Sequence, residues 1–103
     1  MIRAEFYESK GILTGFRMSG HSGYAESGSD IVCAAVSSAV QLTANTMEAF
    51  GCKIKVAVDD SAVKCVAEEA DENAVRLVDS LLLHIKAISE DYPKTIKIIT
   101  TEV

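Results

Sequence analysis

Two hydrophobic periodicities alternate along the chain and predict seven elements. Five stretches show the two-residue alternation and the composition of half-buried strands: 2–8, 12–19, 53–58, 62–68 and 95–101. In the two longer stretches 30–50 and 71–92, apolar residues return every three or four positions, which predicts helices. The resulting order ββαββαβ favours an α+β domain in which two helices cover a mixed sheet. The pattern leaves open which strands pair.

Turn and capping residues mark the ends of these elements. Short polar turns at 9–11 and 59–61 are expected to join their flanking strands into two hairpins. Capping and terminating residues stand at both ends of each predicted helix: Asp30 or Ser29 and Gly51 for the first, Asp71 and Pro93 for the second. The helices should therefore begin and end close to these positions.

The apolar residues of each helix define the face that we expect to meet the core. In the first helix these are Ile31, Ala35, Ala39, Leu42 and Phe50. The other side of that helix carries Cys33, Ser37, Gln41, Ala44 and Glu48. In the second helix the expected core residues are Val75, Val78, Leu82, Ile85 and Tyr92. This arrangement predicts that Cys33 leaves the core face.

Length and composition predict one globular domain over residues 1–103, with 49% hydrophobic residues and no repeated or biased segment. The formal net charge is −5, from 15 acidic and 10 basic residues, and no dense Lys/Arg cluster breaks this balance. We therefore expect no nucleic-acid or membrane partner, because such binding neutralises phosphates, and basic peptides are better partners. The N-terminus lacks the apolar core of a signal peptide, and no apolar run is long enough to span a membrane, so a cytoplasmic location is expected.

Three cysteines are present, and no two of them form a C-x-x-C pair. We expect no structural disulfide, no metal and no other cofactor, because neither zinc-type spacing nor a phosphate- or dinucleotide-binding glycine pattern occurs. Cys52 follows the residue that ends the first helix, and Cys65 alternates with apolar residues of a strand. Both are interpreted as packing residues.

Cys33 is the strongest candidate for chemistry because it falls in the first turn of the first helix. Unpaired N–H groups and the helix dipole favour a thiolate there, and a nearby cationic histidine would favour it further. His21 stands at the other end of the intervening loop, which can fold back toward the sulfur. The alternative interpretations are a small core cysteine and an ordinary surface histidine.

The loop between strand and helix is rich in glycine, with Gly20, Gly23 and Gly28. These glycines could let the loop act as a lid over a bound peptide, or could simply make turns. Asp30 has two possible roles, capping the helix or orienting His21. The residues predict acyl transfer: the Cys33 thiolate attacks a carbonyl, N–H groups at the helix start hold the oxyanion, and His21 protonates the leaving amine.

The chain resembles the ribosomal-processing cysteine protease (Prp) family of bacteria. The resemblance rests on Gly20–His21, on the run G-x-D-I-V-C-A-A-V-S at 28–37, and on the order of elements around them. Family members often have a small apolar residue after the histidine, where this chain has Ser22. The departure affects loop contacts rather than the reacting groups.

The resemblance implies a homodimeric Cys/His protease with Cys33 as nucleophile, His21 as base, and supporting roles for Asp30 and Ser37. It also implies the substrate, the precursor of the twenty-seventh protein of the large ribosomal subunit. A short N-terminal extension would be removed after paired aromatic residues. Two rival classes stay open: a non-catalytic dimeric module that binds a ribosomal protein or assembly intermediate, and a thiol redox switch, which the lack of a nearby resolving cysteine disfavours.

Overall fold

The computed structural model describes residues 1–20 and 30–103, and its seven elements follow the predicted order. They are β1 (Ile2–Ser9), β2 (Ile12–Ser19), α1 (Ile31–Ala49), β3 (Ile54–Val58), β4 (Ala62–Ala67), α2 (Glu72–Asp91) and β5 (Ile96–Glu102). Each boundary lies within one or two residues of the predicted one. The α+β class and the ββαββαβ order are confirmed.

The five strands form one mixed sheet in the order β3-β4-β2-β1-β5. Both predicted hairpins are present, and Lys10 and Gly11 connect the first with positive φ values of 53° and 79°. β2 pairs with β4 in antiparallel fashion, whereas β5 lies parallel to β1, with Ile2 beside Ile96. The pairing that the pattern left open therefore places the first and last strands side by side.

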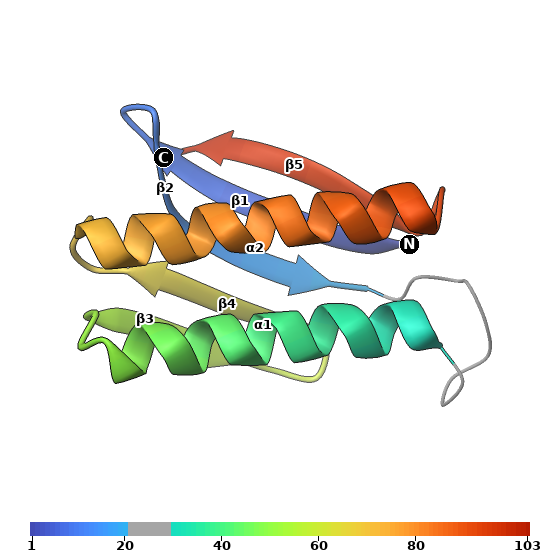
Figure 1. The fold of residues 1–103 in the computed structure, drawn as a ribbon, viewed down its shortest axis with the longest axis horizontal. Coiled ribbons are helices and arrows are strands. Elements are labelled where there is room, and N and C mark those ends of the chain that lie inside the picture. The colour runs from blue at the N-terminus through green and yellow to red at the C-terminus, as the bar shows by residue number, and fades with distance from the viewer. Residues whose placement is uncertain (21–29) are drawn as a thin grey trace.

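Both helices lie on one face of the sheet, side by side and running in opposite directions (Figure 1). Side chains of β1 and β2 alternate, so Ile2, Ala4 and Phe6 point into the layer beneath the helices together with Phe16 and Met18. The core is this layer. No helix in the described ranges is long and apolar enough to cross a membrane.

The helix α2 contributes Ala74, Val78, Leu81, Ile85 and Ile88 to the core. Val78 and Ile85 are as predicted. Leu82 and Tyr92 are partly buried against the core, and Val75 is half-buried. The predicted stripe is thus shifted slightly around the helix. Asp71 caps α2 as predicted, accepting the Ala74 N–H at 2.8 Å.

The predicted core face of α1 is wrong. The buried residues are Val32, Val36, Val40 and Met47, whereas Ile31, Ala35, Leu42 and Phe50 are exposed and Ala39 is half-buried. Apolar residues surround most of this helix, so two faces had helical spacing, and the core takes the one with three valines four residues apart. The caps are as predicted, with Asp30 at the N-terminus and Gly51 following the C-cap at a φ of 77°.

Candidate active site

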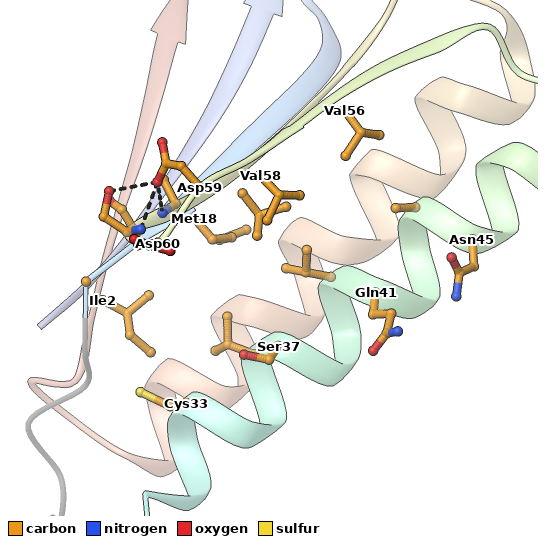
Figure 2. Close-up of a pocket in the computed structure, with 18 residues that line it drawn as sticks. Ile2, Met18, Cys33, Ser37, Gln41, Asn45, Val56, Val58, Asp59 and Asp60 are labelled. Carbon is orange, nitrogen blue, oxygen red and sulfur yellow. Dashed lines mark hydrogen bonds between the residues drawn. The ribbon is translucent and has the colours of Figure 1, made fainter. Parts of the chain in front are cut away.

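A cavity of about 590 Å³ separates α1 from the β3–β4 end of the sheet, and we call it the α1 groove. One wall is formed by α1 residues, among them Cys33, Val36, Ser37, Val40, Gln41 and Ala44. Met18, Val56, Val58 and Val63 line the opposite wall. Figure 2 shows Cys33, Ser37, Gln41 and Asn45 following one another along α1, with the valines of β3 across from them. The groove is mostly apolar, with polar side chains along one line of α1, and it carries a thiol at one end.

The groove exists because β3 faces α1 without being covered by it. Ile54, Val56 and Val58 alternate onto the helix side of the sheet, yet Val56 is 49% exposed and Val58 69% exposed. On α1 the facing positions include small residues such as Ala44 and Ser37, which do not reach across. Apolar surface is therefore left open on both walls, as expected where an apolar ligand binds.

Cys33 lies in the first turn of α1, at the end of the groove nearest Ile2 (Figure 2). Its side chain is half-buried and packs against the edge of the core cluster. Because Cys33 follows the buried Val32, it sits at the border of the core face, and the prediction that it leaves this face is only partly right. The sulfur is therefore held at the edge of the core and is also accessible from the cavity.

Asp30 organises the start of α1 through both of its carboxylate oxygens. Oδ1 accepts the backbone N–H groups of Val32 and Cys33 at 3.1 and 3.0 Å, and Oδ2 accepts the Cys33 thiol at 3.2 Å. Of the two roles considered for Asp30, capping is thus present. The prediction of unpaired N–H groups in the first turn is wrong for these two, because the capping side chain has satisfied them.

Ser37 lies one turn after Cys33 and is exposed on the groove side of α1. The structure therefore brings together Cys33, Asp30 and Ser37. Gln41 continues the same line one turn further, as the shared face predicted.

Gly20 closes β2 at the groove with a φ of 81°, and a Cβ on it would lie 2.6 Å from the Met1 carbonyl oxygen. Glycine is therefore required here by both conformation and space. The predicted base His21 and the predicted lid glycines Gly23 and Gly28 lie outside the described residues.

The other two cysteines are packing residues, as predicted, and both are buried. Burial raises the pKa of the Cys65 thiol. Burial also raises the pKa of Cys52, and the Asp71 carboxylate, which accepts its thiol at 3.7 Å, adds to this effect. Within residues 1–20 and 30–103, no three His, Cys, Asp or Glu side chains are grouped so as to hold a metal ion.

Sequence reasoning missed the sheet side of the groove. Met18, Val56 and Val58 belong to strands whose neighbours were unknown, and the turn residues Asp59 and Asp60 were interpreted only as a turn. The Asp59 carboxylate accepts the Ser61 N–H, its hydroxyl and the Ala62 N–H at 2.8 to 2.9 Å, and these bonds lower the pKa of Asp59. The rim of the groove thus carries a charged carboxylate, and the only sequence signal for it was the Asp-Asp-Ser turn itself.

Comparison with known proteins gives one consistent family. The family model of the cysteine protease Prp matches residues 1–97. The ribosomal processing cysteine protease Prp of Bacillus subtilis (strain 168) is 29% identical over 110 residues, which cover 97% of each chain.

Solved structures agree in fold. An essential ribosomal processing protease Prp from S. aureus, in complex with a covalently linked product peptide, superposes with a TM-score of 0.92 at 23% identity, covering 98% of this chain and all of that one. SMU.848 from Streptococcus mutans gives a TM-score of 0.83 at 31% identity, over 100% of this chain and 96% of that one.

Proposed function

Because the chain belongs to the cysteine protease Prp family, which acts in ribosomal processing, we propose that Cys33 is the nucleophile of a Cys/His endopeptidase. The substrate is the precursor of the twenty-seventh protein of the large ribosomal subunit, whose N-terminal extension is removed. One observation carries this proposal: the Cys33 sulfur stands in the first turn of α1 at the end of an apolar groove.

The reaction proceeds in two steps. The Cys33 sulfur attacks the scissile carbonyl, its proton passes to His21, and His21 gives that proton to the leaving amine as the peptide bond breaks. Water, deprotonated by His21, then attacks the thioester, and the thiol is restored. The oxyanion formed in each step competes with Asp30 Oδ1 for the Cys33 N–H, so we expect Asp30 to yield that bond as the oxyanion forms.

The groove supports the expected preference for aromatic residues before the cleavage point. Val36 and Val40 of α1 line the groove together with Val56 and Val58 of β3, which gives an apolar slot that also contains Cys33. Asp59 and Asp60 at its rim provide negative charge for basic residues of a ribosomal precursor. We expect Ser37, one turn from Cys33 and on the groove side of α1, to donate a hydrogen bond to the substrate.

The homodimer and the cytoplasmic location stay predictions. Leu42 and Phe50, predicted to be core residues, are instead 67% and 61% exposed on and just after α1. Apolar side chains left open in this way support contact with a second copy of the chain.

The direct test is incubation with the precursor protein followed by intact-mass measurement of both products. We expect Cys33→Ala and Cys33→Ser to abolish cleavage while the circular dichroism spectrum stays native. His21→Ala should lower the rate by about 10²-fold or more, the usual loss for a positioned acid–base group. Ser38→Ala, an exposed α1 position outside the groove, is the control and should cleave normally. Turnover by Cys33→Ala would refute the assignment.

The alternative function is a binding module whose cysteine is incidental. Exposure alone favours alkylation of Cys33 in the folded protein, because Cys33 opens into the groove while Cys52 and Cys65 are buried. The rate of that alkylation therefore separates the two functions. As the nucleophile of a protease, Cys33 should react faster near neutral pH than a free cysteine in a peptide does. A rate no faster than that of the free cysteine would favour the binding module.

A further inference from the structure

The face of the sheet opposite the helices gathers half of the basic residues of the chain. Strand alternation and register bring five cationic side chains onto it from all five strands: Arg3, Arg17, Lys55, Lys64 and Lys97. Arg3 lies beside Lys97 across the β1–β5 pair, and Arg17 lies beside Lys64 across β2–β4. In the described part of the chain no helix covers this face (Figure 1).

Glu5 is the one acidic strand residue on the same face. It lies directly opposite Arg17 in the β1–β2 pair, and it accepts the Thr101 hydroxyl at 2.6 Å and the Tyr7 hydroxyl at 3.5 Å. The Asp59 carboxylate, in the turn between β3 and β4, also interacts electrostatically with Arg17. Among the strand residues of this face, five are basic and one is acidic, whereas the chain as a whole has 10 basic and 15 acidic residues. The face is therefore strongly positive on a molecule with a net charge of −5.

An aromatic ring lies on the same face, one row of the sheet away from Arg17 and Lys64. Tyr7 is half-buried, and the Lys64 ammonium stands 5.1 Å from its ring centroid. A hollow that also includes Lys64 is lined by Lys55, Val56, Ala57, Lys64 and Val66. A ring within a cationic sheet surface is the combination on which bases stack while phosphates pair with Lys and Arg.

We propose that this open sheet face, centred on Tyr7, Arg17 and Lys64, binds RNA through its phosphate backbone. A protein partner is less favoured, because specific protein interfaces have an apolar centre and the largest aliphatic side chains here are the half-buried Val66 and Ile99. The choice of RNA as the ligand rests on the proposed function, because the precursor of a ribosomal protein is located close to RNA. The expectation of no nucleic-acid partner came from the acidic net charge and the absence of a dense Lys/Arg cluster in the sequence. The sheet register brings these cations together although they are far apart in the sequence.

Such binding would leave the α1 groove free. The cations alternate onto one side of the sheet, whereas Cys33 and the groove lie between the sheet and α1 on the other. The protein could thus hold RNA and a peptide at the same time.

The test is fluorescence anisotropy with a labelled 20-nucleotide single-stranded RNA at several salt concentrations. Arg17→Gln combined with Lys64→Gln should weaken binding by tenfold or more at low salt. It should also reduce the slope of log K against log salt by about 1.4, since each phosphate contact on a single strand contributes about 0.7. The matched control, Arg76→Gln combined with Lys86→Gln, removes the same charge from α2 and should change the affinity less than twofold.

Cleavage of a free precursor peptide should be the same in all three proteins, so a failure of the proposed protease function would appear separately, as no cleavage by the wild type. Three results would overturn the RNA proposal. They are no binding at low salt, an equal loss in both double variants, and polyglutamate of matched length binding as tightly as RNA, which would point to an acidic protein partner.

Discussion

The sheet beneath α2 is fully covered, whereas the sheet edge at β3 is left open beside α1. On the α2 side, Phe6 and Phe16 are fully buried with ring centroids 6.4 Å apart, and α2 contributes five buried residues to the same core. The helix α1 also contributes four buried residues, but β3 has none, and the groove separates β3 from the helix. The core thus ends before β3, and apolar surface and a thiol are exposed there.

The difference in packing between the two regions should be largest when a large side chain is truncated. We expect Phe16→Ala to reduce the free energy of unfolding by about 3–5 kcal/mol, because it removes a fully buried ring from a packed core. Val56→Ala on the groove wall should cost no more than about 0.5 kcal/mol, as surface substitutions usually do. Urea unfolding measures both values. Similar losses would mean that β3 is packed in solution.

The groove can be tested from the substrate side. Replacing either of the paired aromatic residues of an extension peptide with alanine removes buried apolar area worth about 3 kcal/mol if the ring is fully engaged, which lowers kcat/KM by roughly 100-fold for each ring. High salt should weaken only the part of the affinity that comes from the acidic rim. The parent and substituted peptides are compared at low and high ionic strength. Equal efficiency of the two peptides would eliminate the aromatic slot.

The two N-cap residues allow a direct comparison, because Asp30 caps α1 and Asp71 caps α2 in the same way. Asp30→Ala and Asp71→Ala should each destabilise the protein by about 1 kcal/mol, the usual loss of an N-cap. Only the change at Asp30 should also impair cleavage, because Asp30 contacts the Cys33 thiol. Asp30→Asn should restore most of the stability, since asparagine caps well. Equal activity of the two alanine variants would leave Asp30 with a capping role alone.

Much of the fold was predictable because its signals are local. The two hairpin turns and the caps Asp30, Asp71 and Gly51 each depend on a few neighbouring residues, and all are present. The first-turn position of Cys33 followed from the cap alone. The buried face of α1 was not predictable, because Ile31, Ala35 and Leu42 return at helical spacing as well as the valines do.

The sheet side of the groove depended on pairings between distant segments. No local pattern indicates that β4 inserts beside β2, so the positions of Val56 and Asp59 opposite α1 could not be predicted. The same holds for the five cations of the open face. Each belongs to a different part of the sequence, and only the register brings them together.

The smallest expected effect concerns alkaline pH. The pKa of the Cys65 thiol is raised by burial, so the unfolded chain loses this proton first as the pH rises, and stability falls above the ordinary thiol range near pH 8.5. We expect the unfolding free energy of wild type to decrease more steeply between about pH 8 and 10 than that of Cys65→Ala. Parallel curves would contradict the raised pKa. Cys33→Ala, at the groove, provides the comparison variant for the same titration.

The parallel pairing of β1 with β5 has a consequence for how the chain acquires its structure. The N–H of Ile2 bonds to the carbonyl of Thr95 at 2.9 Å, so one edge of the first strand stays unpaired until β5 has been synthesised. Both hairpins can form as soon as they leave the ribosome, but their sheet cannot be completed at that stage. Long-range closure of this kind slows folding, because the loop entropy is lost before the contact is gained. The nascent chain must therefore carry an unpaired strand edge while both helices and three further strands are being made.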